Sequence, residues 1–287
     1  MSGLPIVIVV CLGSAILAMA SFALTRKLLR PIDISEHQTF LDAMFNIVGT
    51  LVSLILGLLV AAALDQYQNL ERAVDNEAAS VSEIYRFSRG LQEPSRGQIQ
   101  GLCERYCQLV ISDEWPALAK GQVSQAVFET FCLLNDEVVL IHPTHDGESN
   151  LQASMLESLD TVGAGRRERL LTLNNTREHL LGPILLAGAI IVLAFTFFYV
   201  KSNSLFHSVV IAFVAIALGG NMALIYVLSK PFEGEWKIQP RAFALNLQAR
   251  QMLRESTLLD PAQARSIPLK PRTSNLSPSP RQPKQDQ

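Results

Sequence analysis

Long apolar stretches alternate with more polar segments along the chain, and this pattern predicts the architecture. Four stretches lack Asp, Glu, Lys and Arg: residues 4–24, 43–64, 183–200 and 205–228. Each has about the length that an α-helix needs to cross a hydrocarbon core of about 30 Å, because a helix rises about 1.5 Å per residue. Only residues 201–204 separate the last two stretches, which should form a hairpin. We expect four membrane-spanning helices.

Basic residues near the ends of the stretches predict the orientation, because cytoplasmic loops carry an excess of Lys and Arg. One side has Arg26, Lys27, Arg30 and Lys201. The other side has Arg72, Arg166, Arg167, Arg169, Arg177, Lys230, Lys237 and Arg241. We therefore expect residues 65–182 and both termini to be cytoplasmic, in a multi-pass membrane protein. The first stretch lacks the basic segment of a signal peptide and should remain as a span.

The region between the second and third stretches has the periodicity of helices. Apolar residues continue at three- and four-residue spacing past the second stretch, with no Gly or Pro in residues 60–89, so this span should continue as one long helix. A second helix should begin with a capping box formed by Ser95 and Gln98. It should end at Trp115, because Pro116 disfavours helical torsion angles in the residue before it.

Two further helices should complete this region. The third is expected to start near Ser124 and to end before a loop at residues 142–147, where Pro and Gly favour a turn. The fourth is expected to start near Asn150, to break at Gly163 and Gly165, and to lead into the third span.

Together these elements predict an all-α fold, a four-span helical membrane protein with a cytoplasmic helical bundle inserted between spans two and three. The expected organisation is transmembrane helices at 1–64, a cytoplasmic helical region at 65–182, transmembrane helices at 183–228, a juxtamembrane turn and amphipathic helix at 229–258, and a tail at 259–287. The tail is rich in Pro, Ser and Gln and should be disordered.

Composition narrows the classes of function. Of the 287 residues, 49% are hydrophobic and only 17% are charged, which is typical of a membrane protein. The 24 basic and 26 acidic residues nearly balance, so we expect no nucleic-acid partner. The cysteines have neither zinc-site nor disulfide spacing, and we expect them to be unpaired: Cys11, Cys103, Cys107 and Cys132.

Two polar clusters contain residue types that bind metal ions or act as catalytic acids and bases. One loop holds His142, His145, Asp146 and Glu148. A turn at Pro143 and Gly147 explains it more simply than a metal site does. Asp113 and Glu114 point in different directions on a helix, which disfavours an acid/base pair. We expect no catalytic residue, metal or cofactor. We interpret Trp115 as part of a hydrophobic corner and expect Glu114 to be bonded to a nearby Arg or a backbone amide.

The second stretch carries a narrow polar stripe. At helical spacing, one face presents Asn46, Thr50, Ser53 and Gly57, and Gly49 and Ala61 extend a ladder of small residues beside it. Close packing of helices is the simpler interpretation, because small residues favour it in lipid. The alternative is that several copies of the stripe surround an ion path, in which neutral hydroxyl and amide groups solvate an anion without trapping it.

The fourth stretch has a similar ladder at Ser208, Ala212, Ala215 and Gly219. Asn221 in this stretch and Asn46 in the second must face protein or water, because an unpartnered amide in hydrocarbon is costly. None of the four stretches contains a charge, which argues against an ion-coupled carrier.

Motifs spread over residues 40–245 form a recognisable set: Glu77-Ala78, Tyr85-Arg86, Leu91, Pro94, Tyr106, Glu114-Trp115-Pro116, Arg166-Arg167 with Arg169-Leu170, and Pro231-Phe232 with Gly234. Together they resemble the bestrophin-like family of bacterial membrane proteins, the DUF4239 group. The Glu-Trp-Pro corner and the Pro-Phe-x-Gly turn are the most specific of them. The resemblance implies four spans and an inserted cytoplasmic helical region.

The resemblance also implies architectural roles for Glu77, Tyr85, Arg86, Tyr106, Glu114, Trp115, Pro116, Arg169, Pro231, Phe232 and Gly234. Bestrophins are pentameric anion channels whose second span lines the pore. We therefore expect a homo-oligomeric channel for small anions in the lipid bilayer, without enzymatic activity, whose path is lined by Asn46, Thr50, Ser53 and Gly57. The alternative is a non-conducting membrane scaffold or sensor that binds a partner through its cytoplasmic bundle or tail.

Overall fold

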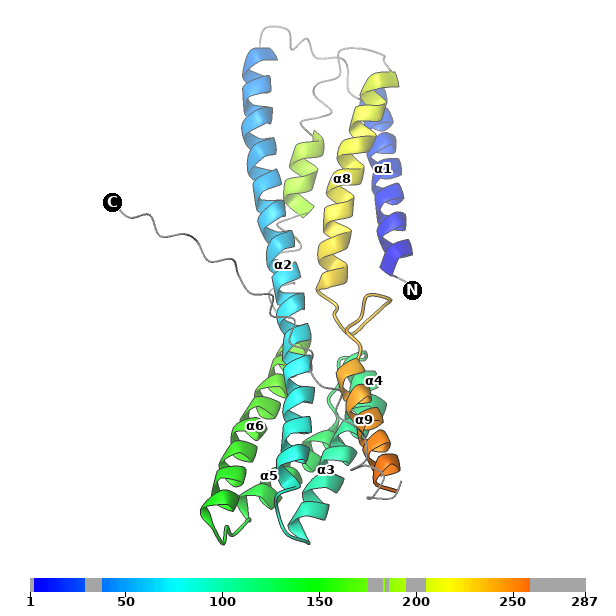
Figure 1. Cartoon of the computed structure of the whole chain (residues 1–287). Helices are drawn as coiled ribbons and strands as arrows, with labels where there is room; N and C mark the ends of the chain where they lie inside the picture. The colour runs from blue at the N-terminus through cyan, green and yellow to red at the C-terminus, as the bar shows by residue number, and fades with distance from the viewer. Residues whose placement is uncertain (1–2, 29–37, 175–182, 184–185, 195–204, 259–287) are drawn as a thin grey trace, which may run out of the picture. The chain divides into compact units, whose positions relative to one another are not determined.

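The computed structural model describes residues 3–28, 38–174, 183, 186–194 and 205–258, and every regular element in these ranges is helical (Figure 1). The helices are α1 (Gly3–Leu28), α2 (Gln38–Ser88), α3 (Ser95–Leu109), the π-helix η2 (Val110–Glu114), α4 (Trp115–Leu118), α5 (Gln125–Val139), α6 (Asp146–Leu171), the 3-10 helix η3 (Thr172–Asn174), α8 (Leu205–Leu228) and α9 (Arg241–Leu258). The chain forms two compact units, Met1–Leu247 and Gln248–Gln287, and the core lies in the first.

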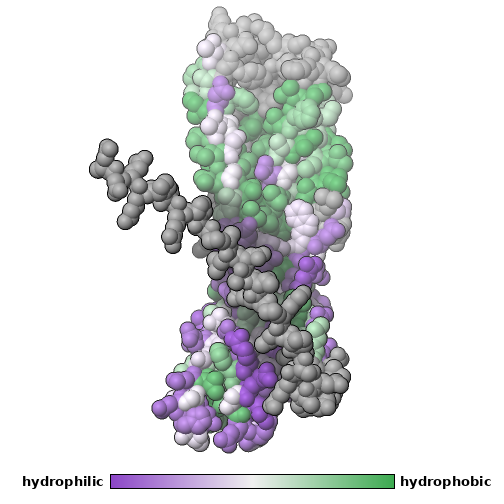
Figure 2. Space-filling model, in the orientation of Figure 1, coloured by the Kyte–Doolittle hydropathy of each residue, from purple (hydrophilic) through white to green (hydrophobic). Residues whose placement is uncertain are grey.

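Three helices in the described ranges are long and apolar enough to cross a membrane: Val7–Leu24 within α1, the stretch of α2 that begins at Ala43, and Ser208–Leu228 within α8. Many of their large apolar side chains are exposed, and Figure 2 shows a green surface beside the purple surface of the polar helices. A continuous apolar surface of this kind is stable only in apolar surroundings. The remaining expected span, residues 183–200, lies partly outside the described residues, and residues 186–194 of it are helical.

Helix α2 is one continuous helix of 51 residues, as its lack of internal Gly and Pro past residue 60 predicts. At about 1.5 Å per residue it is about 76 Å long, more than twice the thickness of a hydrocarbon core. In its first half, apolar side chains such as Leu54 and Leu58 are exposed. In its second half, the apolar side chains form one buried line: Leu70, Val74, Ala78, Val81 and Ile84. The helix therefore changes from a lipid-type surface to an amphipathic one along its length.

The second half of α2 packs against α3 and α6, and α5 packs against both α3 and α6. Their inward apolar residues form one core: Ile99, Cys103 and Tyr106 of α3, Val127, Leu134 and Val138 of α5, and Met155, Leu159 and Val162 of α6, together with the residues of α2 and Phe243 of α9. Burying each Val, Leu or Ile side chain stabilises the fold by about 1.5–3 kcal/mol. No disulfide joins the cysteines, which are Cys11, Cys103, Cys107 and Cys132, in agreement with their spacing.

The small-residue ladder of α8 packs against α1. The Ser14 hydroxyl of α1 donates a hydrogen bond to the carbonyl oxygen of Ala215 at 3.0 Å. A Cβ atom at Gly219 would lie 2.9 Å from the Cβ atom of Ser14, and one at Gly220 would lie 3.3 Å from the sulfur of Cys11. Close helix packing therefore explains this ladder.

The expected capping box at the start of α3 is wrong. The N-cap residue is Pro94, which has no side-chain cap bond, and Ser95 is already in the helix. The carboxylate of Glu93 replaces the cap, because its Oε2 accepts a hydrogen bond from the backbone amide of Gly97 at 3.0 Å. Glu93 lies one residue before the N-cap, and its long side chain can reach the unpaired amides of the first helical turn, as a Ser cap would. Its negative charge is also favourable at the positive end of the helix dipole.

The expected end of this helix at Trp115 is also wrong. The chain continues without a break from α3 through η2 into α4, and Trp115 keeps helical torsion angles of φ −61° and ψ −46°. The amide of Trp115 bonds to the carbonyl of Val110, five residues back, in the wider turn of a π-helix. Pro116 follows within the first turn of α4, where a missing amide hydrogen is tolerated.

Helix α6 differs from the expected fourth helix in its start and in its continuity. It starts at Asp146 rather than near Asn150, because the imidazole of His145 caps it by accepting from the amide of Glu148 at 3.1 Å. It also runs through Gly163 and Gly165 without a break. Both glycines lie where α6 approaches neighbouring side chains closely, so they serve packing.

Candidate functional site

The polar stripe of α2 is exposed along the apolar half of the helix. All four of its residues, Asn46, Thr50, Ser53 and Gly57, are exposed in the single chain. A Cβ atom added at Gly49 or Gly57 would have no atom of a described residue within 4 Å. Within the described chain, therefore, helix packing accounts for the ladder of α8 and not for the stripe of α2.

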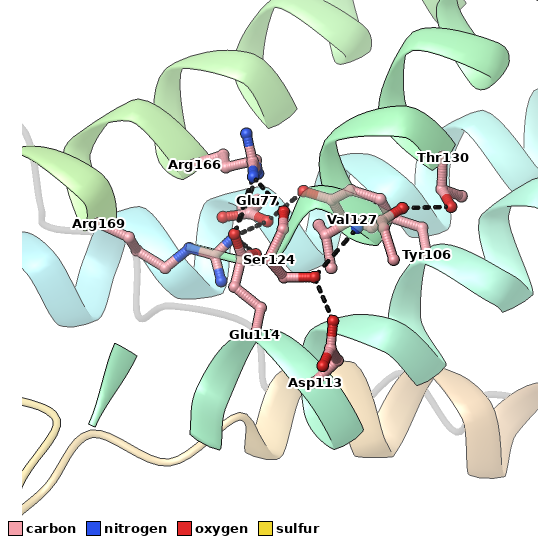
Figure 3. A network of polar contacts seen from close by, with 10 residues as sticks. Glu77, Tyr106, Asp113, Glu114, Ser124, Val127, Thr130, Arg166 and Arg169 are labelled. Carbon is pink, nitrogen blue, oxygen red and sulfur yellow. Dashed lines mark hydrogen bonds and ion pairs between the residues drawn. The ribbon is translucent and has the colours of Figure 1, made fainter. Parts of the chain in front are cut away.

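The polar half of the same helix carries a buried ion network, which we define as Glu77, Glu114, Arg166 and Arg169 (Figure 3). The Nη2 atom of Arg169 lies 2.8 Å from Oε1 of Glu77 and 3.0 Å from Oε2 of Glu114. Arg166 is bound to Oε1 of Glu114 at 3.0 Å. Two acidic and two basic groups thus neutralise one another between α2, η2 and α6.

Local helix geometry places these charges. Arg166 and Arg169 are three residues apart on α6 and therefore lie on one face of it. In η2, Glu114 points into the core, whereas Asp113 is exposed and accepts a hydrogen bond from the hydroxyl of Ser124, the N-cap residue of α5. The two adjacent carboxylates therefore have different structural roles, one in the ion network and one beside a helix cap.

Aromatic side chains enclose Arg169. Its guanidinium carbon lies 5.1 Å from the ring centre of Trp115 and 6.0 Å from that of Phe243. Trp115 also packs edge-on against Phe232 at 5.8 Å, and its Nε1 donates to the carbonyl of Ile238 at 2.8 Å. This contact ties the turn after α8 to the bundle.

Burial dominates the electrostatics of Glu77. It raises the pKa of this carboxyl to about 7, although Arg169 and a hydrogen bond from Tyr106 both lower it. The hydroxyl of Tyr106 donates to Oε1 of Glu77 at 2.7 Å, and burial keeps its own pKa well above the usual value. Oε2 of Glu77 and Nε and Nη1 of Arg169 are buried, and no described residue forms a hydrogen bond with them. The network is therefore sensitive to the protonation of Glu77.

The structure brings together only some of the motif residues. Glu77, Tyr106, Glu114, Trp115, Arg169 and Phe232 are buried and linked by the contacts above. Arg86 is exposed, 3.8 Å from Glu83, and Pro116 is exposed on the outer side of α4. Pro231 is buried, and Gly234 has a φ of 79°, which favours glycine in the turn after α8. Tyr85 is half-buried on α2.

Three residues of this region were not among those expected to have an architectural role: Arg166, which the motif set contains, Ser124 and Phe243. The three-residue spacing of Arg166 and Arg169 is a signal that could have identified the first of them. In the loop at residues 142–147, the imidazole of His145 caps α6. The described part of the chain contains no group of three or more His, Cys, Asp or Glu side chains that could hold a metal ion.

The fold and its apolar helices define a helical membrane protein. A family model described as the Bestrophin-like domain matches residues 12–243. A crystal structure of a substituted bacterial bestrophin homologue from Klebsiella pneumoniae superposes with a TM-score of 0.60 at 14% identity, over 85% of this chain and 95% of its own. A crystal structure described as a membrane protein gives a TM-score of 0.59 at 12% identity, over 86% and 96%. None of the curated proteins matches the chain.

The family model covers most of the chain, and this chain belongs to the Bestrophin-like family. At 12–14% identity, the solved structures show the likeness of the fold.

Proposed function

We propose that the protein is a homo-oligomeric channel for small anions whose path is lined by the polar stripe of α2: Asn46, Thr50, Ser53 and Gly57. The observation that carries this proposal is the exposure of the stripe on the first half of α2, where the other exposed residues are mostly apolar. Polar groups facing hydrocarbon are costly, so the stripe is stable only against protein or water. A ring of copies around a water-filled path supplies both.

The chemistry of the stripe suits a weakly held ion. Its groups are an amide, two hydroxyls and a glycine backbone, and none is charged. The Thr50 hydroxyl donates to the backbone carbonyl oxygen of Asn46, one helical turn earlier, at 2.6 Å. The four-residue spacing places the two residues on one face of α2. Neutral donors replace part of the hydration shell of an anion without binding it tightly, which permits conduction.

The proposal includes the topology. The protein has four spans in a bacterial inner membrane, with both termini and the helical bundle on the cytoplasmic side, and the distribution of basic residues supports this orientation. In this arrangement α2 is both the wall of the path and, through Glu77, a part of the bundle. The buried ion network then holds the cytoplasmic half of the pore helix in place.

Ion flux from liposomes tests the function. Purified protein is reconstituted, and chloride efflux is compared among wild type, Ser53→Leu and Ala62→Leu. Ala62 is an exposed small residue nine positions from Ser53, so it lies on about the opposite side of α2. We expect Ser53→Leu to abolish efflux and Ala62→Leu to retain it.

Other outcomes separate the rivals. Equal efflux from wild type and Ser53→Leu would contradict the assignment of the stripe. Flux of sodium without chloride would overturn anion selectivity. Absence of any flux in folded, oligomeric protein would favour the non-conducting scaffold or sensor, which binds its partner through the bundle or the tail.

A further inference from the structure

We propose that the turn after α8, residues 229–240, is a membrane-contact surface, and that its exposed Trp236 and the nearby Tyr226 of α8 lie in the phospholipid headgroup layer. Two large aromatic side chains are exposed near this turn: Tyr226 at 52% and Trp236 at 44%. Trp and Tyr favour this layer because one end of each side chain is apolar and the other forms hydrogen bonds. This inference depends on the membrane location of the chain and not on conduction.

The depth of this surface follows from two helices independently. The apolar stretch Ser208–Leu228 has 21 residues and a length of about 31 Å, which matches a hydrocarbon core of about 30 Å. Its end places Tyr226 and the turn at the edge of that core. On α2 the uncharged stretch ends at Leu64, three residues before Tyr67.

A tertiary contact joins the end of the apolar stretch of α2 to the turn after α8. The hydroxyl of Tyr67 donates to the backbone carbonyl of Trp236 at 2.7 Å. A small pocket of about 10 Å³ at the same level is lined by Gln66, Tyr67, Leu70, Thr172, Leu228, Ser229 and Pro231, which confirms that this part of α2 adjoins the end of α8. Both apolar stretches therefore end beside the turn, as they should where the hydrocarbon core ends.

The turn is anchored to the bundle and exposes charged side chains. The amide of Ile238 bonds to the carbonyl of Pro231 at 2.8 Å, and Phe232 and Ile238 are buried in the bundle core. Lys230 lies over the ring of Tyr226, with its ammonium nitrogen 5.3 Å from the ring centre, and pairs with Glu233 at 3.2 Å. Lys237 is exposed next to Trp236. Ammonium groups at this level are within reach of lipid phosphates, which both zwitterionic and anionic phospholipids carry.

Tryptophan fluorescence provides the test, because the chain has only two tryptophans and Trp115 is buried. Full-length protein is reconstituted into phosphatidylcholine vesicles containing lipids brominated either close to the headgroup or near the end of the acyl chain. We expect the shallow bromine to quench more emission than the deep one. Trp236→Phe should lose most of the quenched emission, and it should fold because the Trp236 backbone, not its side chain, accepts the bond from Tyr67.

Three results would overturn the proposal. Equal lipid quenching in wild type and Trp236→Phe would mean that Trp236 is not in contact with lipid. Stronger quenching by the deep bromine would place it in the hydrocarbon core. Quenching of Trp236 by aqueous iodide alone would show that the turn faces water, where it is free to contact a soluble protein.

Discussion

Gly165 of α6 lies directly against Glu77 of α2. A Cβ atom at position 165 would be 2.8 Å from the Cβ atom of Glu77 and 2.9 Å from the carbonyl oxygen of Ala73. Real Cβ atoms do not approach other atoms so closely. The carbonyl oxygen of Ala73 belongs to the backbone of α2, so it cannot move aside as the end of a flexible side chain can. The absence of a side chain at one residue therefore sets how closely the two long helices of the bundle approach, and places Arg169 within reach of Glu77.

Replacing Gly165 with alanine should destabilise the bundle by about 1–3 kcal/mol, because the added methyl group forces α6 away from α2. Gly101 is the matched control, since it lies inside α3 and a Cβ atom there would meet nothing within 4 Å. Gly101→Ala should raise stability by about 0.5–1 kcal/mol through its better helix propensity. Unfolding of the purified proteins in detergent measures both changes, and equal effects would contradict the role of Gly165.

Replacing Arg169 with methionine should cost about 3–5 kcal/mol, because it leaves Glu77 without a basic partner in the core. The adjacent Arg167 is exposed, and Arg167→Met should change stability by no more than about 0.5 kcal/mol. The double variant Glu77→Gln with Arg169→Met should be more stable than Arg169→Met alone, since Glu114 keeps Arg166. Additive losses in unfolding experiments would show that the two side chains are not coupled.

The raised pKa of Glu77 predicts a pH dependence of stability. The folded state holds the proton up to about pH 7, whereas the ordinary pKa of a glutamate carboxyl is 4.5. The stabilising contribution of the proton is therefore complete below about pH 4.5 and is lost as the pH rises through about 7, a change of about 3 kcal/mol. Glu77→Gln mimics the protonated acid and should remove this part of the pH dependence. Thermal unfolding from pH 4.5 to 8 measures it, and parallel curves for the two proteins would refute the assignment.

Features that depend on local sequence were predicted well. The continuity of α2 follows from the absence of Gly and Pro after residue 60, and Ser124 was identified as the start of α5, where it caps the helix by accepting from Val127. Errors arose where a nearby residue or turn offered an alternative to the expected local structure, and where packing against another helix decided the conformation. Glu93 replaces the Ser95 cap, a π-helical turn carries the chain through Trp115-Pro116, and Gly165 serves packing instead of ending a helix.

The sequence by itself determined that the protein belongs in a membrane and which helices are apolar, because an uncharged stretch of sufficient length has no stable alternative in water. It also revealed the stripe of α2, which depends only on helical periodicity. The tertiary structure decided that Glu77 meets Arg169, 92 residues away, and that the ladder of α8 packs on α1 while the stripe of α2 stays uncovered by described residues. Charge pairing and close packing depend on which surfaces meet in space, and periodicity along one helix does not specify its neighbour.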